Sequence, residues 1–205
     1  MKPPDSLPGR LFLLAYDLNK QRMTARDRLG YILRGAALTE LYLDGRLTGD
    51  KRPQAATDGD DPYGIRGQIA GSRARSWQYW VRKDNRKMVA TVRAELAAGG
   101  WIRVEFRRRF GIFPCHRVTV RDPRVVKNLW GGASSALHGR PVARVHSYDA
   151  ATVALAAAGG LRTVLPRADR RRHRRRIAEL TARSGPAVPA VHKAVQTDHL
   201  AATSG

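Results

Sequence analysis

The stretch LRGAALTELYLDGRL, from Leu33 to Leu47, contains the end of the clearest helix in the sequence. Apolar side chains recur in it, and just before it, at intervals of three and four residues, which is the spacing of one wide helical face. These side chains are Leu29, Ile32, Leu33, Ala36, Ala37 and Leu41. Glycine readily takes the left-handed conformation that ends helices. We therefore expect a helix inside the domain that stops at Asp44-Gly45, with a short strand after it.

The start and the packing of this helix can also be predicted. Thr24 and Asp27 have the spacing of a capping box, which places the start of the helix there. Small residues along the helix would let a neighbouring helix approach closely. They are Gly30, Gly35, Ala36 and Ala37.

Arg34 is a charged residue within this otherwise apolar helix. Burying a charge is costly, so its guanidinium needs a compensating partner. A phosphate is one candidate, because arginine forms bidentate contacts with phosphate. Pairing with Glu40 or another carboxylate of the fold is the other candidate, and the sequence leaves both open.

A second amphipathic helix is expected after the aromatic segment Trp77 to Trp80. One stripe along it is apolar, as expected for a helix with one buried edge. The stripe consists of Met88, Val89, Val92 and Leu96. The remaining surface is basic, with Arg82, Lys83, Arg86, Lys87 and Arg93.

Two alternating segments follow that helix and predict a β-hairpin. Trp101 to Phe106 and Cys115 to Val120 alternate as half-buried strands do. The tip between them contains Arg107, Arg108, Arg109, Phe110, Gly111, Ile112 and Phe113. Apolar side chains at a turn are unfavourable in water. They either enter the headgroup region of a membrane while the arginines meet phosphates, or they fold back onto the domain.

The elements together predict a mainly α fold, a compact helical domain with a small protruding β-hairpin. The glycine-rich segment Gly131 to Ser135 lacks the spacing of a nucleotide-binding loop and is expected to be a turn. After about Ser184, proline, alanine and threonine predominate without a sustained period, which is typical of disorder. The expected organisation is one domain over residues 1–183 and a disordered tail over residues 184–205.

Charge is the most unusual property of the sequence. Lys and Arg number 38 against 17 Asp and Glu, which gives a net charge of +21. Only seven of the basic residues are lysine, which leaves 31 arginines, and seven of these lie between Arg167 and Arg176. A field of this sign favours polyanionic partners such as nucleic acid, anionic lipid headgroups or acidic proteins. A GC-rich genome is an alternative reason for the excess of arginine.

No arrangement of residues predicts catalysis. Cys115 is the single cysteine, which excludes an internal disulfide and a thiolate zinc cluster. The six histidines show no HExxH spacing. We therefore expect no enzymatic activity, no cofactor and no metal. Apolar runs are all shorter than the roughly 20 residues of a spanning helix, so the expected location is cytoplasmic with peripheral membrane contact.

Several segments resemble the Golgi phosphoprotein 3 family. They are the Leu33 to Leu47 stretch, LPGRLFLLAYD near the start, RKMVATVRAELAAGGWI in the second helix and IFPCHRVTV in the hairpin. In the family's order they cover most of residues 6–183. The high arginine and alanine content is similar to that of the bacterial, actinobacterial branch.

The resemblance implies a mainly helical fold with a protruding hairpin that binds phosphatidylinositol 4-phosphate and docks on membranes. Eukaryotic members also capture cytosolic tails of glycosyltransferases at the Golgi, so tails of membrane proteins are possible partners here. In the lipid site, the arginine of the LRG signature corresponds to Arg34, and an arginine of the later helix corresponds to Arg86.

The sequence departs from the family at two lipid-contact positions. Ala25 stands in place of a pocket tryptophan, and Val89 falls near a second arginine of the later helix. Lys87 or Arg93 is a candidate substitute for that arginine. The family's apolar hairpin insertion corresponds to Phe110, Ile112 and Phe113. Binding to anionic membranes is therefore expected more firmly than strict specificity for one phosphoinositide.

The main functional hypothesis is a peripheral module that binds a phosphoinositide or other anionic phospholipid. The alternative is a nucleic-acid-binding protein, because a basic helix followed by a wing-like hairpin also suits a DNA reader. Whether the domain forms a homo-oligomer is left open.

Overall fold

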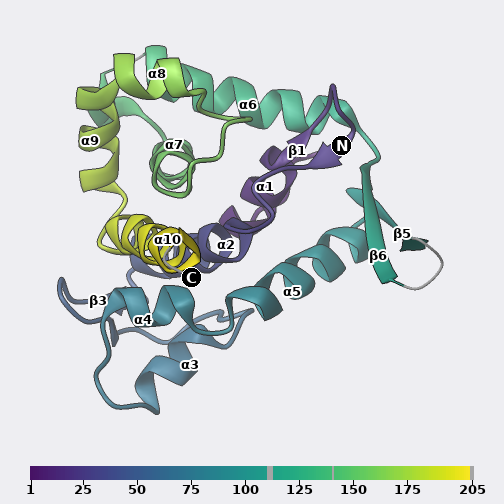
Figure 1. Cartoon of the computed structure of the whole chain (residues 1–205). Coiled ribbons are helices and arrows are strands. Elements are labelled where there is room, and N and C mark those ends of the chain that lie inside the picture. Colours follow the sequence, from purple (N-terminus) through teal and green to yellow (C-terminus); the bar gives the residue numbers. More distant parts are fainter. Residues whose placement is uncertain (110–112, 140, 204–205) are drawn as a thin grey trace.

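Helix α2 (Leu29–Leu43) is the central element of the computed structural model, and the other helices are arranged around it (Figure 1). Twelve of its fifteen residues are buried, as its wide apolar face predicted. It packs against α1 (Leu7–Leu14), α4 (Trp77–Arg82), α5 (Asn85–Ala98), α7 (Ser147–Gly159) and α10 (Ala187–Thr203).

The structure describes residues 1–109, 113–139 and 141–203. Within these ranges the strands form three small two-stranded antiparallel sheets, and the predicted mainly α fold is confirmed. The sheets pair β1 (Tyr16–Asp17) with β2 (Arg22–Met23), β3 (Leu47–Thr48) with β4 (Gln54–Ala55), and β5 (Ile102–Arg109) with β6 (Phe113–Val120). The remaining helices are α3 (Ile65–Ala70), α6 (Pro123–His138), the 3₁₀ turn η1 (Val142–Arg144), α8 (Arg167–Arg172) and α9 (Arg174–Arg183).

Two glycines of α2 set how closely other helices approach it. A Cβ at Gly35 would lie 2.1 Å from Cγ2 of Val191, so α10 packs directly on the α2 backbone. A Cβ at Gly30 would lie 2.6 Å from the backbone oxygen of Asn85, where α5 begins. The expected close approach is confirmed, and the contact at Gly30 fixes the start of the basic helix.

The start of α2 differs from the prediction. The residue before the helix is Arg28, whose side chain makes no capping hydrogen bond. The hydroxyl of Thr24 instead donates to the carbonyl of Ala15 at 2.8 Å, which ties the segment after β2 to the end of α1. The capping-box prediction is therefore wrong, because Thr24 bonds outside the helix.

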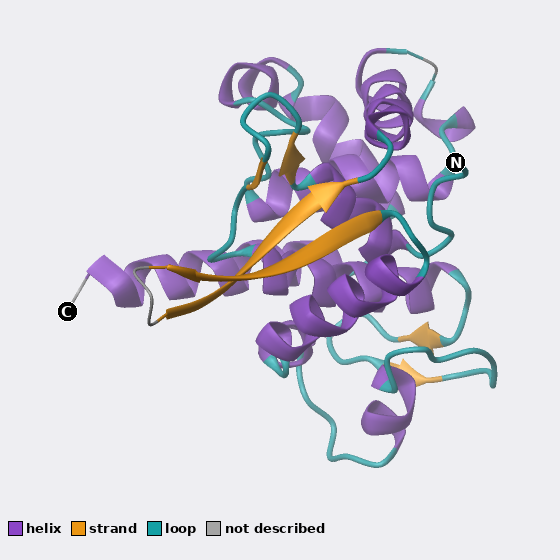
Figure 2. Cartoon of the chain, turned by 90° about the vertical axis from the view of Figure 1, so that its right-hand side faces the viewer, coloured by secondary structure: helices purple, strands orange, loops and turns teal. Residues whose placement is uncertain are grey.

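The β5–β6 hairpin projects from the helices, as Figure 2 shows. Its strands pair from Ile102 opposite Val120 to Arg109 opposite Phe113. Ile102, Val118 and Val120 are buried at its base, which anchors the hairpin to the domain. The prediction of a protruding hairpin is confirmed for these strands.

The segment expected to be a disordered tail is mostly helix α10. Its inner face is fully or nearly fully buried and has helical spacing: Ala187, Val188, Ala190, Val191 and Ala194. Pro189 lies in the first turn, where proline is tolerated. The expectation of disorder from Ser184 is wrong because a stripe of small residues, a weak apolar signal, fits closely against Gly35.

A second difference concerns the expected turn at Gly131 to Ser135, which lies inside α6. The carboxylate of Asp122 accepts a hydrogen bond from the backbone N–H of Arg124 and caps this helix. Its buried face continues past the glycines to Ala133, Ala136 and Leu137, and the helix packs on α7. Tertiary burial here outweighs the low helix propensity of glycine.

Candidate functional site

Arg34 lies within the fold and is only 3% exposed. Its Nε donates to the backbone carbonyl of Trp80 at 3.1 Å, and an Nη donates to Oε1 of Gln68 at 3.4 Å. Burial lowers the pKa of Arg34, whereas the charges of Asp84 and Asp61 raise it. The guanidinium therefore has partners inside the protein.

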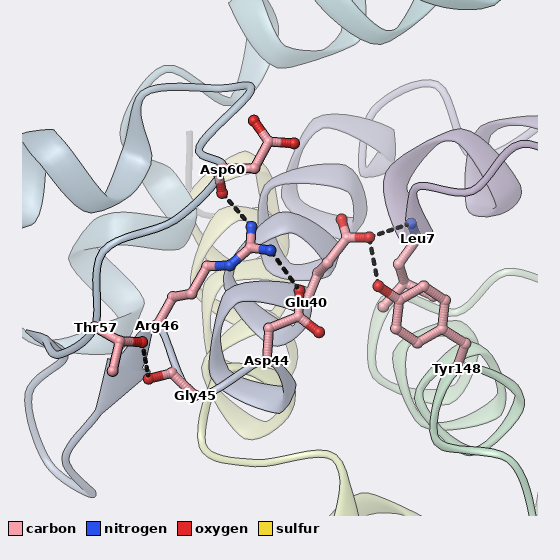
Figure 3. Close-up of polar contacts among 8 residues, drawn as sticks. All are labelled: Leu7, Glu40, Asp44, Gly45, Arg46, Thr57, Asp60 and Tyr148. Atoms are coloured by element: carbon pink, nitrogen blue, oxygen red, sulfur yellow. Dashed lines mark hydrogen bonds and ion pairs between the residues drawn. The ribbon is translucent and has the colours of Figure 1, made fainter.

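Glu40 is not the partner of Arg34, so the predicted pairing with this carboxylate is wrong. Oε1 of Glu40 accepts hydrogen bonds from the Tyr148 hydroxyl at 2.7 Å and from the backbone N–H of Leu7 at 3.1 Å (Figure 3). Burial raises the pKa of Glu40, and the two hydrogen bonds act in the opposite direction. Glu40 thus connects α2 to α1 and α7.

A groove of about 590 Å³ lies at the foot of the hairpin, and we call it the hairpin-base groove. It is lined by Phe12, Gln21, Arg22, Met23, Arg26, Leu29, Val89, Arg93, His116, Arg117 and Val118. Four of these described residues are arginines and none carries a carboxylate. Phe12, Leu29 and Val118 are buried beneath them. The groove combines positive charge with an apolar floor.

A second groove of about 800 Å³ lies where α5 begins, and we call it the α5 groove. It is lined by Arg26, Asp27, Gly30, Tyr31, Arg82, Asp84, Asn85, Arg86, Lys87, Val89 and Asp198. Four basic side chains face three carboxylates, and one carboxylate, that of Asp198, comes from α10. Burial raises the pKa of Tyr31, and its hydrogen bond with Asp198 raises it further. Charge in this groove is largely balanced.

The two grooves are neighbours, because Arg26 and Val89 line both. Of the side chains predicted to bind a headgroup, Arg86 and Lys87 line the α5 groove, and Arg93 lines the hairpin-base groove. Arg34 is not among the residues that line either groove. The basic helix therefore places three of the four predicted residues on one continuous surface.

Besides Arg82, which ends α4, three arginines of this surface were not predicted to bind a headgroup. Arg22 is in β2, Arg26 lies between β2 and α2, and Arg117 is in β6. They meet because β2 packs against β6. No local pattern in the sequence indicates this contact between segments far apart along the chain.

The predicted membrane-inserting tip falls largely outside the described residues. Phe110 and Ile112 belong to the segment 110–112, which the structure does not describe. The backbones of Arg107, Arg108, Arg109 and Phe113 lie in β5 and β6. The expected roles of their side chains stay predictions.

A model of the Golgi phosphoprotein 3 (GPP34) family matches residues 7–197. The chain belongs to the Golgi phosphoprotein 3 family. The resemblance inferred from the sequence is thereby confirmed, and the match extends through most of α10. A comparison with curated proteins returned no match.

In this Golgi phosphoprotein 3 family member, none of the described helices is both long and apolar enough to cross a bilayer. The described residues also contain no group of three or more His, Cys, Asp or Glu side chains placed to hold a metal ion.

The arginine-rich run of this Golgi phosphoprotein 3 family member lies away from both grooves. Helices α8 and α9 are on the side of the molecule opposite the β5–β6 hairpin (Figure 1). Most of their arginines are exposed, although Nε of Arg176 donates to the carbonyl of Ala136 at 2.7 Å. This run offers a charge-matched control for experiments on the grooves.

Proposed function

We propose that the protein is a peripheral membrane-binding module, without catalytic activity, that recognises anionic phospholipids, phosphoinositides among them. The observation that carries the proposal is the continuous basic surface formed by the two grooves beside the projecting hairpin. It presents Arg22, Arg26, Arg82, Arg86, Lys87, Arg93 and Arg117.

The strength of such a surface is sufficient for reversible attachment. Each basic residue near an anionic leaflet contributes about 1 kcal/mol, so the four arginines of the hairpin-base groove, which no carboxylate of the described residues lines, supply several kcal/mol. Apolar side chains that enter the headgroup region add to this term. Membership of the Golgi phosphoprotein 3 family supports the same function.

Vesicle flotation tests the proposal. The full chain should float with phosphatidylcholine vesicles that contain phosphatidylserine or phosphatidylinositol 4-phosphate, and not with phosphatidylcholine alone. Equal retention on neutral and anionic vesicles would contradict the proposal.

A tryptophan introduced by Phe110→Trp separates membranes from nucleic acid. Its emission, taken as the difference from the unsubstituted chain, should shift to shorter wavelength with anionic vesicles and stay unchanged with duplex DNA. Tight binding to duplex with no affinity for vesicles would instead support the nucleic-acid alternative.

A further inference from the structure

The four arginines of the hairpin-base groove form no ion pair with a carboxylate among the residues that the structure describes. They come from four different parts of the chain, and their guanidinium groups make no hydrogen bond or ion pair with another described residue. Glu105 lies opposite Arg117 and Asp17 lies opposite Arg22 in the strand registers, but neither carboxylate lines the groove. Like charges brought together repel, so this groove favours an anion.

The apolar floor of the groove indicates which kind of anion binds there. Phe12, Leu29 and Val118 are buried below the arginines, and Met23 and Val89 are partly buried at its sides. A free inorganic anion leaves this apolar surface uncovered. An amphiphile with a phosphate group suits both the arginines and the floor. Its phosphate binds the guanidinium groups, and its apolar portion covers the floor.

The other basic positions are less suited to hold a phosphate. In the α5 groove, which Arg26 also lines, the three carboxylates of Asp27, Asp84 and Asp198 face four basic side chains, whereas no carboxylate of the described residues lines the hairpin-base groove. Arg34 is buried inside the fold and donates hydrogen bonds to Trp80 and Gln68. The unbalanced positive charge is thus concentrated nearest the hairpin.

We propose that the hairpin-base groove is the phosphate site of this chain, with Arg22, Arg26, Arg93 and Arg117 holding the phosphate of an anionic phospholipid. The adjoining glycerol and first acyl carbons lie on the floor formed by Phe12, Leu29 and Val118. This inference rests on the proposed membrane function and assigns the headgroup contact to residues other than Arg34. A volume of about 590 Å³ is in the range of small-molecule sites.

Three double variants, each removing two positive charges, test the assignment. Arg93→Gln with Arg117→Gln alters only the hairpin-base groove, and Arg82→Gln with Arg86→Gln alters only the α5 groove. Arg171→Gln with Arg174→Gln alters the exposed run on α8 and α9. Affinity for vesicles containing phosphatidic acid should fall at least about tenfold for the first pair and less than about threefold for the other two.

Two outcomes would overturn the site. Equal losses in all three pairs would mean that only net charge matters, and a larger loss in the second pair would move the site to the α5 groove. In both cases the membrane function would stand. If the unsubstituted chain bound no anionic vesicle at all, the proposed function itself would fail.

Soluble probes add a measurement that distinguishes a lipid from free phosphate. Dihexanoyl phosphatidic acid should bind at least about tenfold more tightly than glycerol 3-phosphate, because only the former covers the apolar floor. Similar affinities for the two probes would refute the role of the floor. Arg93→Lys with Arg117→Lys, which keeps the charge and alters the donor geometry, should lose part of the affinity and serves if the glutamine pair does not fold.

Discussion

Nε of Arg34 donates to the backbone carbonyl of Trp80 at 3.1 Å, and this hydrogen bond joins the central helix to the end of α4. The last carbonyl groups of a helix have no partner within the helix, so a guanidinium there acts as a C-terminal cap. Arg34 thus has a structural role that its position in the family signature does not reveal.

The Arg34→Ala variant should therefore be less stable yet still bind vesicles. Loss of the cap leaves the Trp80 carbonyl unpaired and opens a cavity, which together cost about 2–4 kcal/mol in the free energy of unfolding. Denaturant unfolding measures the change. Arg86→Ala, at an exposed position, is the control and should change stability by less than about 0.5 kcal/mol. Full stability combined with lost vesicle binding in Arg34→Ala would instead support a direct contact with lipid.

The contact between Gly35 and Val191 makes a second prediction. Gly35→Ala places a Cβ where Cγ2 of Val191 lies and should destabilise the fold by about 1–3 kcal/mol. Adding Val191→Ala should recover part of this loss, which a double-mutant cycle detects as coupling. Gly131→Ala is the matched control, because its Cβ meets no atom within 4 Å and it should stabilise α6 by about 0.5–1 kcal/mol. Additive effects of the first two substitutions would show that the helices do not meet there.

Glu40 should make stability depend on pH. Burial raises its pKa in the folded state, so its contribution to stability is full below the ordinary glutamate value and is lost as the pH rises through the raised value. Glu40→Gln stays neutral and keeps an acceptor for Leu7 and Tyr148. Its stability relative to the unsubstituted chain should therefore increase between pH 4 and pH 7 in urea unfolding. Glu179→Gln, at an exposed position, should show no such trend.

The buried face of α10 supplies the fourth prediction. Ala194 is fully buried, so Ala194→Asp places an unpaired charge in the core and should lower the free energy of unfolding by more than about 3 kcal/mol. Gln196→Asp, on the exposed side of the same helix, should have an effect below about 0.5 kcal/mol. Thermal unfolding of both variants gives the comparison. Equal and small effects would mean that α10 is not docked on α2.

The sequence was sufficient to predict the parts of the fold that large apolar residues define. Leu29, Ile32, Leu33 and Leu41 mark α2 by their spacing, and the alternation around Val118 marks the hairpin. It was insufficient for α6 and α10. Their buried faces contain alanine at positions such as Ala133 and Ala194, whose apolar signal is weak. Burial there depends on the fit to a neighbouring helix, which a single segment does not encode.

The candidate site was also predictable only in part from the sequence. Arg86 was assigned through the family resemblance, and Lys87 and Arg93 were candidates because they lie on the same basic helix. Arg22 and Arg117 join them only through the packing of β2 on β6, a contact between segments far apart along the chain. The hydrogen bond of Arg34 to Trp80 likewise joins segments that are far apart along the chain. The family signature alone does not predict this contact.

The packing of α10 on Gly35 also constrains how the chain is made. Protein synthesis proceeds from the N-terminus, so a ribosome releases α2 long before Val191 emerges. Until then one apolar side of the nascent central helix stays without its cover, and this part of the core closes only after α10 has emerged. A translational pause before Val191 emerges would therefore prolong a state open to chaperones and proteases.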